Sequence, residues 1–208
     1  MLIHKEKEKN KISSLLVMGA KLYTVAMLLR IYPVYLCVKL SRVESVIKED
    51  ILRWTSILRV PYRNAFGIMA LGHLLIFYKE FRNLIIHRLG RNTLLGLITR
   101  FLFPRMDTLH IGCPDIGGGL YIQHGIATII SAKKIGRNCW VNQQVTIGYN
   151  GLEAPVLGDN VTVYAGAKII GGVTIGNDVI VGANAVVCKS VPDNVVVGGV
   201  PSRVIRKR

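Results

Sequence analysis

The sequence predicts a mainly β protein with a helical first half, in which several α-helices precede a parallel β-helix. Two observations lead to this fold class. Residues 105–208 repeat an aliphatic residue every six positions, whereas residues 1–104 place apolar residues three and four apart, as in amphipathic helices. The chain has 208 residues, half of them hydrophobic, which suffices for one compact domain and a second, smaller one. We therefore expect a helical region over 1–104, serving oligomerisation or membrane-surface association, and a β-helix over 105–208.

Most of the positive charge lies in the helical half. Residues 1–105 contain 18 Lys and Arg against 6 Asp and Glu, so this half holds +12 of the net charge of +15. Such an excess suits nucleic acid, an anionic membrane surface or phosphate-bearing ligands. The sequence has no zinc-ligand spacing, no basic-region heptads and no aromatic RNA-binding signature. We therefore expect no nucleic-acid partner.

The beginning of the chain is Lys-rich up to Lys11 and then apolar from Ile12 to Leu40, with charged residues in between. No uncharged run reaches the roughly 18 residues of a spanning helix, and no signal-peptide cleavage pattern follows. These helices pack against other helices or another subunit, or they lie on the inner membrane surface with their cations toward anionic lipid. Both interpretations remain open.

The four cysteines, Cys37, Cys113, Cys139 and Cys188, have neither zinc-site spacing nor the density of a disulfide framework. We expect reduced thiols and a cytoplasmic protein, with the inner face of the cytoplasmic membrane as the alternative location. The helical pattern continues to about Arg100, is interrupted at Gly90 and ends near Phe103. His73 and His87 lie within its apolar runs, so we expect them in the core or an interface.

A period of six dominates the second half. Gly often follows the aliphatic residue, and a six-residue unit suits one flat face of a three-sided coil whose aliphatic side chain points inward. Three units complete a coil, and stacked coils form a continuous core. The repeating aliphatic positions are Ile135, Val141, Ile147, Leu157, Val163, Ile169, Ile175, Val181 and Val187.

Two departures from the period indicate where function lies. The spacing from Ile122 to Ile129 is seven, so one extra residue accompanies His124, and the spacing from Ile147 to Leu157 is ten, which predicts a projecting loop. Counting forward from His124 by one coil at a time, with the extra residues included, gives residues that stack above one another at a single corner of the solenoid. Small side chains at this corner leave backbone amides open to a long, thin ligand. The stacked positions are His124, Gln143, Ala165 and Ala183.

Four segments together resemble the hexapeptide acyltransferases, in particular serine acetyltransferases and their bacterial polysaccharide O-acetyltransferase relatives. The segments are GGLYIQHGIATII, VNQQVTIG, VYAGAKIIGGVTIGNDVIVGANAVV and SVPDNVVVGGVPSRVI, and they span nearly all of residues 110–206. The resemblance implies a left-handed β-helix that forms a homotrimer, with acetyl-CoA as co-substrate between neighbouring subunits. Whether trimers pair into hexamers stays open.

The resemblance also implies roles for individual residues. His124 matches the general base, which takes the proton of an attacking hydroxyl, and an amide near Gly148 or in the adjoining interface stabilises the oxyanion. Arg203 and Lys207 are expected at the coenzyme A phosphates or in a solvated basic tail. The remaining positions expected along the coenzyme channel are Gln143, Gly148, Ala165, Gly166 and Ala183.

Three positions depart from the serine acetyltransferase pattern and set the expected acceptor. Leu109 and Ala154 stand where an Asp and a His are expected, and Gln123 replaces the usual Asp before His124. We therefore expect acetyl transfer to a hydroxyl of a sugar in a capsular, exopolysaccharide or lipopolysaccharide unit. The alternatives are a serine O-acetyltransferase of cysteine biosynthesis and a non-catalytic β-helix scaffold.

A zinc-dependent carbonic anhydrase on a similar β-helix would need three histidines across a subunit interface. The repeat region contains only His110 and His124. No metal is expected.

Overall fold

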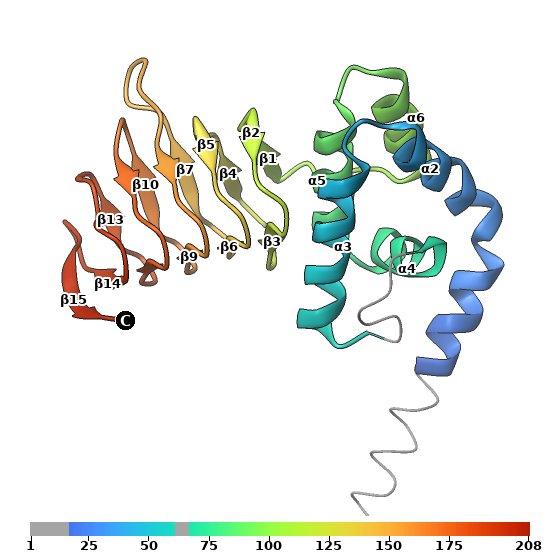
Figure 1. Ribbon diagram of the computed structural model, residues 1–208, viewed down its shortest axis with the longest axis horizontal. Coiled ribbons are helices and arrows are strands. Elements are labelled where there is room, and N and C mark those ends of the chain that lie inside the picture. Colours follow the sequence, from blue (N-terminus) through green and yellow to red (C-terminus); the bar gives the residue numbers. More distant parts are fainter. Residues whose placement is uncertain (1–16, 61–66) are drawn as a thin grey trace, which may run out of the picture.

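The computed structural model describes residues 17–60 and 67–208. The Lys-rich start of the chain lies outside the described residues. Figure 1 shows the two expected parts, a group of packed helices at one end and an elongated β-solenoid extending from it. The helices end at Leu102 and the first strand begins at Leu109.

The helical region owes its boundaries to local signals. Gly90 has φ 87°, a conformation in which glycine is favoured, and it ends the helix before it, as expected. The Thr93 hydroxyl accepts a hydrogen bond of 3.2 Å from the Gly96 N–H and so caps the start of the next helix. The helices are Val17–Ala26, α2 (Leu28–Leu40), α3 (Glu44–Leu58), α4 (Ile68–Phe77), α5 (Lys79–Leu89) and α6 (Leu94–Leu102).

Among the described helices, none is by itself both long and apolar enough to cross a bilayer. Val17–Ala26 and α2 satisfy that length and composition only when taken together, and they are bent by 76° where they meet.

The solenoid is a triangular prism whose three faces are parallel sheets, and each strand lies directly above the strand one coil earlier. The first face consists of β1 (Leu109–Ile111), β4 (Thr128–Ile130), β7 (Thr146–Gly148), β10 (Lys168–Ile170) and β13 (Val186–Val187). The second face consists of β2 (Asp115–Ile116), β5 (Lys134–Ile135), β8 (Val156–Leu157) and β11 (Thr174–Ile175). The third face consists of β3 (Tyr121–Ile122), β6 (Trp140–Val141), β9 (Thr162–Val163), β12 (Ile180–Val181) and β14 (Val195–Gly198), with β15 (Arg203–Lys207) antiparallel at its end.

Every aliphatic residue of the six-residue period is buried inside the prism. One expectation was wrong by one position: Ile129 is 44% exposed, and its neighbour Ile130 is fully buried and points inward. Two extra residues therefore lie between Ile122 and Ile130, and one residue fewer lies between Ile130 and Ile135. This coil is still one residue longer than three six-residue units, because Ile122 pairs with Val141, 19 positions later.

The ten-residue spacing forms the expected loop. Between β7 and β8 the chain leaves the prism and folds back on itself, with Asn150 and Glu153 bridged. The loop projects beyond the outline of the solenoid (Figure 1), and Leu152 at its tip is 99% exposed.

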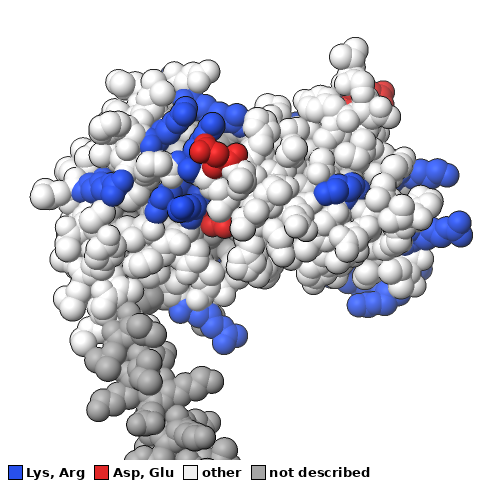
Figure 2. All heavy atoms as spheres, turned by 180° about the vertical axis from the view of Figure 1, so that it is seen from behind, with Lys and Arg blue, Asp and Glu red and all other residues white. Residues whose placement is uncertain are grey.

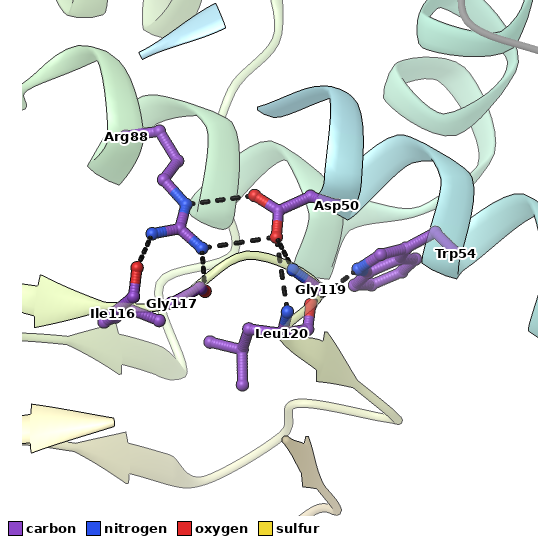
Figure 3. A network of polar contacts seen from close by, with 7 residues as sticks. All are labelled: Asp50, Trp54, Arg88, Ile116, Gly117, Gly119 and Leu120. Atoms are coloured by element: carbon purple, nitrogen blue, oxygen red, sulfur yellow. Dashed lines mark hydrogen bonds and ion pairs between the residues drawn. The ribbon is translucent and has the colours of Figure 1, made fainter. Parts of the chain in front are cut away.

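A buried ion pair fastens the helices to the first coil (Figure 3). Asp50 of α3 is fully buried and meets Arg88 of α5 in a bidentate pair, with N–O distances of 3.0 and 3.2 Å. The same carboxylate accepts hydrogen bonds from the N–H groups of Gly119 (2.8 Å) and Leu120 (3.2 Å). Burial raises the pKa of Asp50 to about 6, while the Arg88 charge and the two amides oppose that rise.

The other hydrogen bonds of this network also join the helices to the first coil of the solenoid. Arg88 donates to the carbonyl groups of Ile116 and Gly117, the second at 2.7 Å, and the Trp54 indole donates to the Leu120 carbonyl at 2.8 Å. Five backbone groups of the turn at this junction thus have partners from the helices. The helical region and the start of the solenoid form one continuous core.

His73 is buried and His87 partly buried, as expected for core histidines. Burial, with the charges of Arg91 and Arg88, lowers the pKa of His87 to about 4.

Candidate active site

His124 lies in the turn that leaves β3, at the corner between the third and first faces. Its side chain is exposed, and its backbone adopts φ 52°, which is uncommon for a residue other than glycine. The Ile126 N–H donates to the His124 carbonyl at 2.6 Å and closes a tight three-residue turn. The two extra residues between Ile122 and Ile130 lie in this turn, and they place the imidazole outside the prism.

Glu80, in the first turn of α5, reaches this turn from outside the solenoid. Its Oε1 accepts a hydrogen bond of 3.2 Å from the N–H of Gly125, the residue after His124. A Cβ at Gly125 would lie 2.9 Å from Leu109 Cδ2 and 3.1 Å from Glu80 Cγ, so both side chains flank this glycine. A carboxylate from the helical region therefore stands beside the position where the family Asp is replaced by Leu109.

His124 and Glu80 line one hollow of about 370 Å³ between the helices and the first coil. Its walls are largely aromatic and aliphatic. Burial, the neighbouring Tyr78 and the Glu80 carboxylate raise the pKa of Tyr121 to about 12, so the Tyr121 phenol stays protonated near neutral pH. The other residues lining the hollow are Trp54, Leu58, Phe77, Tyr78, Tyr121, Ile122 and Gln123.

Gln123 is held by the coil above it. Its Oε1 accepts a hydrogen bond of 3.2 Å from the Trp140 indole, and the Trp140 and Tyr121 rings meet edge to face with centroids 4.8 Å apart. Tyr121 in turn contacts Trp54 of α3, with centroids 4.7 Å apart. This chain of rings fixes the wall behind His124.

The corner above His124 is built as expected. Gln143, Ala165 and Ala183 each follow the inward residue of their coil by two positions, and those inward residues are paired in register. The Gly166 N–H donates to the Gln143 carbonyl at 3.1 Å. Among the residues that the structure describes, the N–H groups of Ala165 and Ala183 donate to no protein acceptor. The free N–H groups of Ala165 and Ala183 thus lie one coil apart on a line that begins at His124. Both are open to the carbonyl groups of a long, thin ligand.

The other residues expected to bind the coenzyme lie partly at this corner and partly elsewhere. Arg203 pairs with Gly198, next to the top of the corner, whereas Lys207 pairs with Val195 near the opposite end of β14. Gly148 ends β7, at the far edge of the first face from the corner of its own chain. One chain therefore brings Arg203, but neither Lys207 nor Gly148, to the His124 line.

Of the polar residues near Leu109 in sequence, neither Asp107 nor His110 lines the hollow of His124. His110 lines a separate small hollow with Arg91 and Arg105, and burial and these two charges lower its pKa. Across residues 17–60 and 67–208, no cluster of three or more His, Cys, Asp or Glu side chains is arranged to hold a metal ion.

Sequence reasoning missed Glu80 and the wall residues Trp54, Phe77 and Tyr78, because they lie in the helical half and belong to no recognisable motif there. The sequence signal for Glu80 is the YKEF segment, in which an acidic residue begins a helix and adjoins aromatic residues.

The comparisons with known proteins agree with this architecture. Residues 154–189 match the family described as "Bacterial transferase hexapeptide (six repeats)". This part of the solenoid contains the hexapeptide repeat of that family. The solenoid is a left-handed β-helix preceded by a helical region, as the sequence predicted.

Curated relatives of this chain have the name serine acetyltransferase. The Staphylococcus xylosus protein is 40% identical over 119 residues, which cover 55% of this chain and 54% of the relative. The Staphylococcus epidermidis protein is 36% identical over 146 residues, covering 68% of this chain and 66% of the relative. The chain thus spans between about half and two thirds of the length of the curated relatives it matches.

Solved structures extend the similarity into the helical half. Serine acetyltransferase from Brucella abortus superposes with a TM-score of 0.61 at 26% identity, covering 79% of this chain and 69% of that one. The Neisseria gonorrhoeae serine acetyltransferase in complex with serine has a TM-score of 0.61 at 24% identity, covering 83% and 72%, and shows the fold alone.

The expected sugar acceptor is contradicted by these relatives, which favour serine over a polysaccharide unit. Leu109 and Ala154 were poor guides to the acceptor, because neither lines the hollow of His124, and a carboxylate enters that hollow from outside the repeats. Glu80 provides it, from a helix whose position relative to His124 no repeat arithmetic reveals.

Proposed function

We propose that this chain is an acetyl-CoA-dependent serine O-acetyltransferase with His124 as its general base. The observation that supports it most is the exposed His124 imidazole in a hollow that also receives Glu80, at the foot of a line of open amides. The relatives named serine acetyltransferase supply the acceptor. With that acceptor, the enzyme would serve cysteine biosynthesis.

The reaction follows from the chemistry of a neutral imidazole. His124 takes the proton of the serine hydroxyl while the hydroxyl oxygen attacks the thioester carbonyl of acetyl-CoA and forms the new C–O bond. The C–S bond then breaks, and the leaving sulfur takes the proton back from the imidazolium. O-acetylserine and coenzyme A are released, and His124 is again neutral.

Glu80 acts as a positioning residue in this proposal. Its hydrogen bond to the Gly125 N–H fixes the turn that presents His124, and its negative charge stabilises the imidazolium formed when the hydroxyl proton is taken. This places on α5 the carboxylate that Leu109 lacks.

The corner line is the proposed coenzyme path. The free N–H groups of Ala165 and Ala183 suit the amide carbonyls of the pantetheine arm, Gln143 adds a polar side chain, and Gly166 keeps the corner narrow. Arg203, beside the top of the line, suits a coenzyme phosphate.

We further propose that the active unit is a homotrimer with sites between neighbouring solenoids. Gly148, at the far edge of the first face, would then serve the His124 corner of a neighbouring subunit as its oxyanion donor. This arrangement gives Gly148 a role that its own subunit's geometry does not allow.

The deciding experiment incubates purified protein with acetyl-CoA and L-serine, follows thiol release and identifies the product by mass spectrometry. O-acetylserine formed at enzymatic rates supports the proposal. Thiol release that L-serine does not accelerate, measured alongside an active serine acetyltransferase, would overturn it.

A further inference from the structure

The helical region exposes an apolar surface that the solenoid does not cover. It comprises one side of the helix Val17–Ala26, one side of α2 and one side of α6, and we call it the outer face. These helices lie at the end of the helical region remote from the solenoid (Figure 1). Its large exposed side chains are Val17, Met18, Leu22, Val25, Leu29, Tyr32, Leu36, Leu40, Leu94, Leu97 and Phe101.

The exposed residues follow helical spacing, so each helix presents them as a stripe. On α2 the most exposed are Leu29 (92%) and Leu40 (76%), and on α6 they are Leu94 (72%) and Phe101 (84%). The opposite side of α2 is buried in the helical core, so this stripe faces away from the protein.

α2 and α6 are held together as one surface. The two helices pack against each other, and Arg30 Nε of α2 donates to the Leu102 carbonyl at the end of α6 at 2.6 Å. The Arg30 guanidinium also lies over the Phe103 ring, 4.8 Å from its centroid. An apolar hollow of about 310 Å³ opens on α2, lined by Leu29, Tyr32 and neighbouring apolar residues.

The charges on these segments have one sign. From residue 17 to 43 the sequence contains Lys21, Arg30, Lys39 and Arg42 and neither Asp nor Glu. From residue 91 to 106 it contains Arg91, Arg100 and Arg105, again without a carboxylate. Just beyond these two segments, Glu44 pairs with Lys39 at 2.6 Å and Asp107 pairs with Arg105 at 3.3 Å, so the surface has an excess of cations rather than cations alone. Figure 2 shows Lys and Arg gathered over the helical part of the surface, with few Asp or Glu among them.

From this pairing of apolar side chains with an excess of cations, we propose that the outer face docks on an anionic lipid bilayer surface. Leucine and aromatic side chains enter the headgroup boundary, while Lys21, Arg100 and the other cations lie at the level of the lipid phosphates. The 76° bend between Val17–Ala26 and α2 suits two helices that lie along such a surface.

A second copy of the chain fits this face less well. A symmetric contact would place the same patch of both copies together, so that the excess cations of each would meet those of the other, while the neighbouring carboxylates Glu44 and Asp107 are already paired within their own chain. Anionic lipid supplies the missing negative charge.

The test is co-sedimentation of the full chain with vesicles of phosphatidylcholine alone or mixed with phosphatidylglycerol, at low and at high salt. We expect binding to the mixed vesicles only, weakening with salt. Lys21→Gln with Arg100→Gln should weaken binding by roughly 30-fold, from about 1 kcal/mol per basic residue. Leu29→Glu with Phe101→Glu should abolish binding, whereas Leu152→Glu on the solenoid loop should not change it. All variants are checked for native circular dichroism.

Equal binding to both kinds of vesicle would overturn the charge argument. Absence of vesicle binding would overturn the proposal as a whole. If, in that case, sedimentation showed an assembly that Leu29→Glu with Phe101→Glu halves in mass, a second copy would be the occupant.

Discussion

Glu80 and Gly125 are 45 residues apart in sequence, yet the Glu80 carboxylate accepts a hydrogen bond of 3.2 Å from the Gly125 N–H. This contact joins the helical region to the turn that presents His124. In the proposed mechanism, the turn that presents His124 thus depends on a residue of the helical region.

Replacing Glu80 by Gln tests whether its charge matters. The amide oxygen can still accept from Gly125, but no negative charge faces the imidazolium. We expect kcat to fall at least about fivefold, since a nearby unit charge is worth roughly 1 to 4 kcal/mol, with KM for serine little changed. Steady-state kinetics check this. Glu44→Gln, which removes an exposed ion pair with Lys39, is the matched control and should leave kcat unaltered. A rise in KM with kcat intact would instead make Glu80 a serine-binding group.

Substitution of Asp50 by Asn should destabilise the whole protein. It leaves the Arg88 guanidinium buried without its counter-charge, which costs about 3–5 kcal/mol in comparable pairs. Denaturant unfolding measures the loss. Asp115→Asn breaks the exposed pair with Lys134 and should change the unfolding free energy by less than about 1 kcal/mol. Similar losses for the two variants would mean that the junction does not depend on this ion pair.

Acid should weaken the fold through His87. Its pKa is about 4 in the folded protein against 6.5 when unperturbed, so the unfolded chain binds the proton first. The contribution is complete above pH 6.5 and is lost as pH falls toward 4, by on the order of 3 kcal/mol. Asp50, with its pKa raised to about 6, acts in the opposite direction. The measurement is therefore the difference in unfolding free energy between wild type and His87→Gln across this range. A difference that does not change with pH would contradict the buried neutral imidazole.

Filling the corner with an indole should block the coenzyme path. Ala165→Trp places a bulky side chain beside the free N–H groups, so KM for acetyl-CoA should rise at least about tenfold while KM for serine stays within about twofold. Initial-rate kinetics at saturating co-substrate separate the two. Thr174→Trp, on the second face away from the corner, is the control. Equal effects on both KM values would place the coenzyme elsewhere.

Much of this architecture could be predicted from the sequence because the coils of a solenoid repeat regularly along the chain. Each coil adds a fixed number of residues, so stacking Gln143 under Ala165 required only counting. Counting failed at Ile129 and Ile130: Ile129 lies six positions before Ile135 and fits the period, yet the folded turn places Ile130 inward.

The acceptor side of the site was not predictable by the same means. Glu80 reaches Gly125, the residue after His124, because α5 packs on the first coil through Arg88, Asp50 and the turn amides, a tertiary arrangement that no period encodes. The expectation of a sugar acceptor came from the solenoid positions alone and was wrong for that reason.

The most direct test of the account is the rate of coenzyme A thiol release from acetyl-CoA with L-serine by wild type and by His124→Gln. If His124 is the general base, the variant should keep its fold and its KM for acetyl-CoA and lose roughly 100- to 10,000-fold in kcat. A variant that turns over at the wild-type rate would contradict the central claim.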